Sequence, residues 1–458
     1  MQDHSSAPAG ARTAIPYPST AIGWYSTILL ALLYWLSLLD RSIISLMVDP
    51  IKNDIGISDV QFGMLHGLAF AITFSVFGLL AGTLADRFSR RFIIFVSVAV
   101  WSLATAACGA AKNFSHLLLA RVGVGAGEAG LNPCATSMIT DMFPAKKLTL
   151  ALAIYALGAS AGVGCSFLFG GMLIEAVSTL DAITLPLVGE VRPWQAVFYI
   201  IGVPGIFISV LAFSMPEPKR RGVREAATDR SLLQSVFSGY PDLIRFIRSR
   251  GRFFLCHYLG FGLASIGFTG GQAWYAAHMA RTFGWSPGEI GLGLGLAMII
   301  GGFAGKFVCG FSVNALFARG YKDAQFRWFA LCLVLATPLA VIATTSDNPW
   351  VFLVAICLFM FLLSPFTAIY VSSLNLVTPN ELRGAGVAFF AATVGLIALS
   401  LGPIVIALFS DYVYGGNAIG YGIGSVAAIA CPLAAGFLWW GRRAMHDAVT
   451  AAEQWSED

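Results

Sequence analysis

Two pairs of charged residues, each with one acid and one base, lie inside long apolar stretches of this 458-residue chain. Asp40 and Arg41 are adjacent in the first stretch, and Arg121 and Glu128 lie seven residues apart in the fourth. A spacing of seven places two side chains on one face of a helix, about two turns apart. Burial favours a neutral acid, and a nearby cation favours the carboxylate. We therefore interpret Asp40 and Glu128 as proton-coupling candidates, and Arg41 and Arg121 as their charge partners or as substrate ligands.

The chain that carries these residues is too apolar for an ordinary soluble domain. It is 57% hydrophobic and 11% charged, whereas soluble domains carry about 25% charged residues. Apolar runs near the roughly 20 residues that a spanning helix needs recur along it, and they are too long and uniform for the strands of a membrane barrel. Twelve segments can be delimited: 24–48, 61–84, 92–111, 117–140, 148–177, 195–215, 253–280, 289–313, 328–345, 350–377, 385–409 and 420–440.

The segments form two sets of six around one long polar stretch, 216–252. This organisation predicts an all-α membrane protein with twelve transmembrane helices in two pseudo-symmetric six-helix bundles, 24–215 and 253–441, flanked by tails 1–23 and 442–458. The matching junctions Pro144-Ala-Lys-Lys-Leu and Pro379-Asn-Glu-Leu-Arg support the repeat. Within the central stretch, 231–250 is expected to form an amphipathic helix on the membrane surface. Its apolar side would carry Leu232, Leu233, Val236, Leu243, Ile244 and Ile247.

The basic residues are distributed unevenly between the two sides. Of 28 lysines and arginines, 21 fall in loops on the side of the N-terminus, and three fall inside segments. The opposite side has four: Lys52, Lys112, Arg192 and Arg281. The positive-inside rule therefore predicts that both termini are cytoplasmic. We expect a multi-pass protein of the cell membrane, in a bacterium the inner membrane, and the tail 1–23 does not have the pattern of a cleaved signal peptide.

The turn between the second and third segments contains a small residue, one acid and three bases. It reads Gly82-Thr-Leu-Ala-Asp86-Arg87-Phe-Ser-Arg90-Arg91. A small residue allows close helix approach, and charges in a short turn can hold a neighbouring helix end. An ordinary basic loop would explain the arginines but not Asp86 with Gly82. We interpret these residues as a conformational gate, together with Arg383 at the matching junction of the second half.

The turn resembles the G-x-L-A-D-R-x-x-R-R signature of the major facilitator superfamily. Further residues resemble the spinster branch of that superfamily: Leu-Asp40-Arg41, Trp101-Ser-Leu-Ala-Thr, Arg121-Val-Gly-Val-Gly-Ala-Gly-Glu128-Ala and Asp141-Met-Phe-Pro. The similarity covers most of the first half, whereas the second half matches mainly by layout. The resemblance implies transport of lysolipids or sphingoid lipids, with protons implicated in coupling for some members.

Other polar and small residues have weaker signals. Tyr370 and Asn375 could line a substrate cavity in the second half or join helices to one another. Gly158, Gly162 and Gly164 in the fifth segment favour close helix packing over a gating role. The eight cysteines form no ligand cluster, so we expect neither a metal nor a cofactor. We also expect no nucleic-acid partner and a monomer.

These observations favour a secondary active transporter over an enzyme. The candidate cavity segments offer many Phe, Trp, Leu and Gly residues and few charges, which would suit an amphipathic, lipid-like substrate whose anionic group binds Arg41. Alternating access of the two bundles, driven by protons, is the expected mechanism. A transporter of small organic anions is the alternative. A membrane-embedded lipid enzyme would need a nucleophile and base near the membrane surface, and the six histidines of the sequence form no cluster.

Overall fold

The structure, a computed structural model, describes residues 17–180, 183–185, 188–220, 240–416 and 418–453. Nearly all of them are helical, as the apolar segments predict. Eleven helical stretches are long and apolar enough to cross a membrane. The first half contains α1 (Thr20–Ile43), α2 (Val48–Ile55), α3 (Asp59–Gly63), α4 (Ala69–Arg87), α5 (Arg90–Gly109), α6 (Phe114–Glu128), α7 (Leu131–Met142), α8 (Ala145–Ser178) and α9 (Pro193–Ser209).

The second half begins with α11 (Tyr240–Ser249), a short helix outside the membrane spans. It continues with α12 (Gly251–Phe283), α13 (Pro287–Ala318), α14 (Ala324–Thr345), α15 (Pro349–Leu363), α16 (Phe366–Val377), α17 (Asn380–Leu408) and α18 (Ile419–Glu453). Turns of tighter or wider helix extend several of these elements, at Ile44–Met47, Met64–Leu68, Val210–Ser214 and Phe409–Val413. Since α18 ends at Glu453, it continues into the predicted tail 442–458.

The predicted fourth segment is the one that is missing from these eleven stretches of the described residues. It consists of α6, with 15 residues, and α7, with 12 residues. Pro133 in the first turn of α7 has no N–H to donate to the carbonyl of Ala129, so the helix is interrupted there. The tenth segment is interrupted in the same way at Pro365, between α15 and α16. The two halves thus share a broken fourth helix, which supports the predicted pseudo-symmetry.

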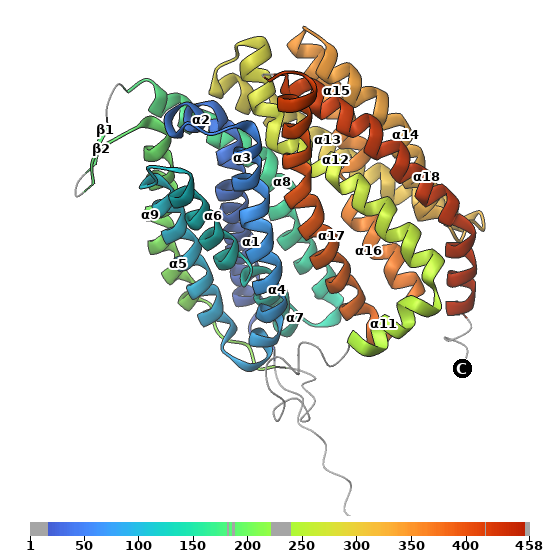
Figure 1. Cartoon of the computed structure of the whole chain (residues 1–458). Coiled ribbons are helices and arrows are strands. Elements are labelled where there is room, and N and C mark those ends of the chain that lie inside the picture. Colours follow the sequence, from blue (N-terminus) through green and yellow to red (C-terminus); the bar gives the residue numbers. More distant parts are fainter. Residues whose placement is uncertain (1–16, 181–182, 186–187, 221–239, 417, 454–458) are drawn as a thin grey trace, which may run out of the picture.

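Figure 1 shows the two ends of the helical bundle. One end carries α2 and a hairpin of β1 (Ile183–Leu185) and β2 (Gly189–Val191), and we call it the hairpin end. The opposite end carries α11 and the last turns of α18, and we call it the α11 end. The hairpin was not predicted, because strands of three residues have no recognisable alternation.

Glycine seams join the two halves. A Cβ built on Gly171 of α8 would lie 2.8 Å from Cα of Gly291 in α13. A Cβ on Gly63 of α3 would lie 3.2 Å from the carbonyl oxygen of Pro403 in α17. Gly158 and Gly164 of α8 approach backbone carbonyls of α1 and α13 in the same way. The predicted packing role of the fifth-segment glycines is confirmed, because small residues allow such close helix contact.

The predicted amphipathic helix is described in part. Leu232, Leu233 and Val236 lie outside the described residues. Leu243 of α11 is fully buried and lies near Gly386 of α17, whereas Ile244 is 41% exposed. The described part of this amphipathic segment therefore packs against α17 through one side and leaves another side free.

Candidate transport site and gates

The predicted proton-coupling residue Glu128 lies at the last position of α6 and is 2% exposed. Its Oε2 accepts hydrogen bonds from Ser37 Oγ at 2.8 Å and from Arg41 Nη2 at 2.6 Å. Both donors belong to α1. The carboxylate therefore ties the first and fourth segments together through one charged and one neutral hydrogen bond.

The guanidinium of Arg41 is held by aromatic rings as well as by Glu128. It lies over the ring of Phe70, 4.2 Å from the centroid, and 5.0 Å from the centroid of Phe74. Both rings belong to α4. A cation over a ring face is attracted by the quadrupole of the ring. Arg41 is thus positioned by three helices: its own α1, α6 and α4.

Asp40 and Arg121 form the second part of this charge cluster. Asp40 is 2% exposed and Arg121 is fully buried. Asp40 lies within electrostatic reach of Arg121 and Glu128. Within the described part of the chain, Oδ1 of Asp40 and all three guanidinium nitrogens of Arg121 have no hydrogen-bond partner. Buried polar atoms are normally hydrogen-bonded, so Arg121 offers a planar set of donors to a group that the described residues do not supply.

The pairing inside the cluster differs from the one that the sequence suggested. Adjacent positions suggested Arg41 as the companion of Asp40, and the spacing of seven suggested Arg121 as the companion of Glu128. Instead, Glu128 binds Arg41 across the helix interface. Residues one position apart on a helix do not face each other, and two turns is a long reach for an ion pair. Interhelical contacts therefore replace the pairs expected within each helix.

His66 joins this neighbourhood from the π-helical turn Met64–Leu68. Its Nε2 is 3.0 Å from Ser45 Oγ, and the charges of Arg41 and Arg121 act on it. In the sequence this histidine stands alone in an apolar stretch, as a residue with a packing role would. A π turn is frequent at functional sites, but the sequence gives no sign of one at this position.

The structure places three predicted residues of the second half, Tyr370, Asn375 and Arg383, apart from the charge cluster. They lie in two different places. The ring of Tyr370 packs at 4.5 Å from that of Phe390 in an aromatic core. Asn375 and Arg383 line a cavity of about 690 Å³ toward the α11 end. Arg383 Nε donates to the carbonyl of Thr378 at 2.9 Å. The hydroxyl of Tyr370 is within electrostatic reach of Tyr34 in the first half.

In the signature turn Gly82–Arg91, the side chain of Arg90 is fully buried and makes several hydrogen bonds. Its Nε donates to Glu217 Oε1 at 2.9 Å, and its Nη2 donates to the carbonyl of Pro218 at 2.7 Å. Its Nη1 donates to Ser137 Oγ at 3.0 Å and to Asp141. Arg90 therefore joins the start of α5, the end of α7 and the segment after α9, all within the first half.

The other predicted gate residues of this turn lie in different surroundings. Gly82 has open space where a Cβ would stand. Arg87 ends α4, and the backbone amide of Arg91 donates to Glu217 at 3.1 Å. The side chain of Asp86 lies outside the described residues. The gate role of these residues stays a prediction.

Glu217 follows the sixth segment and lies outside the membrane spans. Partial burial raises its pKa, but hydrogen bonds from Arg90, the Arg91 amide and Ser89 outweigh burial. Together these donors hold the pKa of Glu217 below its ordinary value, because they stabilise the charged form.

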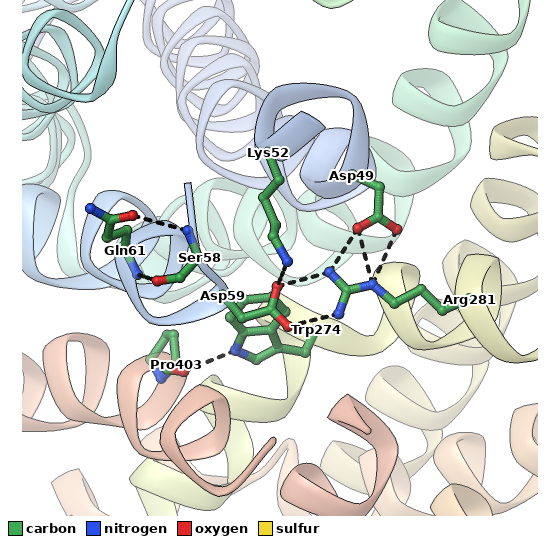
Figure 2. Close-up of polar contacts among 8 residues, drawn as sticks. All are labelled: Asp49, Lys52, Ser58, Asp59, Gln61, Trp274, Arg281 and Pro403. Carbon is green, nitrogen blue, oxygen red and sulfur yellow. Dashed lines mark hydrogen bonds and ion pairs between the residues drawn. The ribbon is translucent and has the colours of Figure 1, made fainter. Parts of the chain in front are cut away.

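A cluster of charges closes the hairpin end between the two halves (Figure 2). Arg281, near the end of α12, binds Asp49 of α2 through Nη2 at 2.7 Å and Asp59 of α3 through Nη1 at 2.8 Å. Lys52 also binds Asp59. Among the ion pairs between described residues, those of Arg281 cross from one half to the other. We call Asp49, Lys52, Asp59 and Arg281 the hairpin-end latch.

The sequence analysis missed this latch, although a signal was present. Lys52 and Arg281 are two of only four basic residues on their side of the predicted topology. Their pairing required knowledge of which loops meet, and Arg281 is 222 residues from Asp59. Sparse charges on the otherwise neutral side are the feature that could have identified it.

Two bundles of membrane-spanning helices, related by a repeat and surrounding a buried charge cluster, define a membrane transporter. The chain belongs to the Major Facilitator Superfamily, whose family model matches residues 30–313. An "MFS-type efflux pump" of Mycolicibacterium smegmatis is 26% identical over 85% of this chain and 84% of that protein. A "probable L-galactonate transporter" of Escherichia coli is 27% identical over 74% of each chain.

A solved structure supports the more specific resemblance. The crystal structure of a bacterial homologue of the human lysosomal transporter spinster, in an inward-facing and unoccupied conformation, has a TM-score of 0.74 to this chain. The two are 25% identical, and the match covers 95% of this chain and 99% of the other. The predicted fold and the resemblance to the spinster branch are confirmed.

Proposed function

We propose that this protein is a proton-coupled secondary transporter of an amphipathic, lipid-like anion, with Arg121 as the principal ligand of its anionic group. The observation that carries the proposal is the fully buried guanidinium of Arg121, whose three nitrogens have no partner among the described residues. A planar guanidinium matches a carboxylate or phosphate geometrically. Arg41 is already engaged by Glu128 and would be released to the same substrate when Glu128 is protonated.

Charge balance in the cluster supplies the coupling. With Asp40 and Glu128 ionised, two negative charges balance Arg41 and Arg121. Each proton taken up leaves one positive charge uncompensated in a desolvated site, where an unpaired charge is costly. An anionic substrate removes that cost, so substrate and proton favour each other's binding, and this linkage is reciprocal. Loss of the protons restores the internal ion pairs and displaces the substrate.

The two halves would exchange access to this site by rocking about their glycine seams. We place the α11 end in the cytoplasm, since most basic residues lie there. The hairpin-end latch would then hold the external side closed, as in the described conformation. In the opposite state the signature turn with Asp86 and Arg383 would close the cytoplasmic side. A single chain supplies both bundles, so a monomer suffices.

The substrate class has two candidates. A lipid-like anion is supported by the likeness to spinster proteins and by the aromatic core of the second half, which includes Phe261 and Tyr370. A small organic acid is supported by relatives whose names specify such substrates, among them the cis,cis-muconate transport protein of Acinetobacter baylyi, 24% identical over 84% of this chain. Both candidates present an anionic group to Arg121.

Transport assays in proteoliposomes test whether transport is coupled to protons. Glu128→Gln and Asp40→Asn should retain counterflow of substrate but lose acceleration by a pH gradient. Glu289→Gln is the matched control, because it removes an exposed carboxylate that only caps α13. Unchanged pH dependence in both cluster variants would refute proton coupling. Joint loss of expression and thermal stability would instead assign the cluster a purely structural role.

A thermal-shift screen decides the substrate class. The full-length protein is heated with lysophospholipids, sphingoid bases, sugar acids, aromatic acids and neutral sugars. Stabilisation by anionic lysolipids that disappears in Arg121→Met supports the lipid-like anion. Stabilisation by small acids alone selects the second candidate. Stabilisation by neutral sugars with no response to any anion would overturn both.

A further inference from the structure

Two exposed tryptophans lie on α18 at the α11 end, and each has an arginine beside it. Trp439 is 53% exposed and Trp440 is 52% exposed. The guanidinium of Arg442 lies 3.3 Å from the ring centroid of Trp439, and that of Arg252 lies 5.1 Å from the centroid of Trp440. Because α18 is a membrane-spanning helix, these side chains face the bilayer near its surface. Interfacial tryptophans are common in membrane proteins, but a stacked arginine on each of two neighbours is a more specific arrangement.

Backbone contacts fix both arginines in place. Arg442 Nε donates to the carbonyl of Trp439 at 3.1 Å, and Arg252 Nη2 lies 3.5 Å from the carbonyl of Trp440. The two guanidinium groups are therefore anchored to consecutive residues of α18. Within the described residues, neither forms an ion pair with a carboxylate. Their remaining N–H groups are available to an external anion.

Further positive charge surrounds this pair. Arg245 and Arg248 of α11, Arg250 before α12 and Arg443 of α18 lie on the same three elements. The acidic residues on these elements are Asp242, Asp447 and Glu453, and the charge of Asp323 before α14 also acts on Arg442. Three of the four are paired, Asp242 with Arg245, Glu453 with Lys322 and Asp323 with Arg327. The local field is positive, and each arginine near an anionic membrane surface contributes about 1 kcal/mol of attraction.

An apolar track continues from the tryptophans toward the membrane centre. Ile429, Leu433, Gly436 and Trp440 are spaced by four, three and four residues, so they share one face of α18. Ile429 and Leu433 are each 51% exposed, and a Cβ on Gly436 would meet nothing within 4 Å. Gly436 therefore leaves a notch between the side chains of Leu433 and Trp440, and an acyl chain could lie in it.

We infer that this surface, formed by Arg252, Gly436, Trp439, Trp440 and Arg442, binds an anionic phospholipid of the surrounding leaflet. The phosphate would lie on the two arginines, and an acyl chain would lie along the Gly436 notch. Guanidinium groups bind phosphate oxygens through paired, charge-assisted hydrogen bonds. The site is remote from the charge cluster and independent of the transported substrate. Only its assignment to the cytoplasmic leaflet rests on the proposed topology.

Native mass spectrometry of the full-length protein tests the inference. The protein is incubated with phosphatidylglycerol or phosphatidylcholine, and the lipid-bound fraction is measured. Wild type should retain phosphatidylglycerol in preference to phosphatidylcholine. The double substitution Arg252→Gln with Arg442→Gln should lower phosphatidylglycerol binding by roughly fivefold for each arginine removed. Arg319→Gln is the matched control, an exposed arginine at the same end of the bundle, and it should bind as wild type does.

Two further variants keep the test decisive if the double substitution fails to fold. Gly436→Leu fills the notch without a change of charge and should weaken retention of the lipid, whereas Gly310→Leu at an open position of α13 should not. Arg252→Lys with Arg442→Lys keeps the charge but loses the planar fork, and it should have intermediate affinity. Equal retention of both lipids by wild type, unchanged binding in Gly436→Leu, or competition by inorganic phosphate would overturn the inference.

Discussion

The two halves of this transporter have the same helical layout but different interiors. The first half buries Asp40, Arg121 and Glu128 among its central helices. The second half buries an aromatic core, with Phe261 in contact with Phe329, Phe366 and Tyr370 and with the buried ring of His257. The first half therefore holds paired charges at its centre, whereas this core of the second half consists of rings. The pseudo-symmetry of the backbone does not extend to the chemistry.

The α11 end repeats the contrast. In the first half, Arg90 satisfies its guanidinium through Glu217, Asp141, Ser137 and Pro218. In the second half, the corresponding region is a cavity of about 690 Å³ with Asn375 and Arg383 in its lining. A fully satisfied buried network rigidifies its surroundings. We expect substitutions in the first half to have the larger consequences, and the following predictions test that expectation.

The largest effect is expected from a pair of arginine substitutions in the charge cluster. Arg41→Met leaves Glu128 without its ion-pair partner and should lower the free energy of unfolding by about 3 kcal/mol. Arg121→Met removes a guanidinium that has no hydrogen-bond partner among the described residues, so stability should fall less than in Arg41→Met, while substrate binding falls on the order of a hundredfold. Thermal unfolding measures the stability of both variants, and binding assays measure their affinity for substrate. Equal loss of stability in the two would contradict the unpartnered state of Arg121.

The hairpin-end latch tests how strongly the halves are joined. Arg281→Gln removes the ion pairs to Asp49 and Asp59, so the population should shift toward conformations open at this end. Spin labels at Asn53 of α2 and Asp347 before α15 should report longer distances. Arg192→Gln breaks a pair with Asp54 inside the first half and should leave the distance distribution unchanged. A response of equal size to both substitutions would show that general surface charge, and not the latch, controls opening.

The Arg90 network should make stability depend on pH through Glu217. Since the folded pKa of Glu217 is depressed, its ionised form stabilises the fold above the ordinary carboxyl range near about 4.3, and the contribution disappears as pH falls through the lower folded pKa. Glu217→Gln should therefore cost about 1–3 kcal/mol at neutral pH and progressively less in acid. Unfolding curves at several pH values measure this, and a difference that grows in acid would contradict the assignment.

The smallest effect is expected from an asparagine pair that compares the two broken helices. Asn132 of α7 accepts a hydrogen bond from the hydroxyl of buried Tyr155, so Asn132→Ala should cost about 1 kcal/mol. Asn375 of α16 lines the open cavity, and Asn375→Ala should change stability by less than about 0.5 kcal/mol. Thermal unfolding of the two variants provides the comparison. The reverse order would show that the cavity is part of the stabilising interior.

The fold could be predicted from the sequence because a bilayer imposes strong and local constraints. A run of about twenty apolar residues in a bilayer must form a helix, because its backbone N–H and C=O groups need hydrogen bonds. The distribution of basic residues between the loops gives an independent check on the number of helices. The break after Glu128 escaped prediction because a proline in a membrane helix is often tolerated. The β1–β2 hairpin escaped because its pairs, such as Ile183 with Val191, are too few to give a periodic signal.

The sequence identifies the residues of the charge cluster but not how they pair. Asp40, Arg41, Arg121 and Glu128 stand out because charges inside spans are costly. Their pairing depends on the rotation of α1 against α6, and no spacing along either helix encodes that angle. The contribution of Ser37 and Phe70 was missed for the same reason, since a serine and a phenylalanine are unremarkable in a membrane helix. The latch of Arg281 required knowledge of a contact between residues more than two hundred positions apart.

Because of the break between α6 and α7, a small bend near Glu128 would move the far end of α7 by a larger distance. Glu128 is the last residue of α6, and α7 extends from just beyond the break for about 18 Å at 1.5 Å per residue. Asp141 lies at the far end of this arm, where it binds Arg90. A bend of about 10° at the break would displace that end by roughly 3 Å, which exceeds the tolerance of a hydrogen bond. Under the proposed coupling, a change of protonation at Glu128 would act beside this break, and a small bend there would become a larger displacement at the Arg90 network.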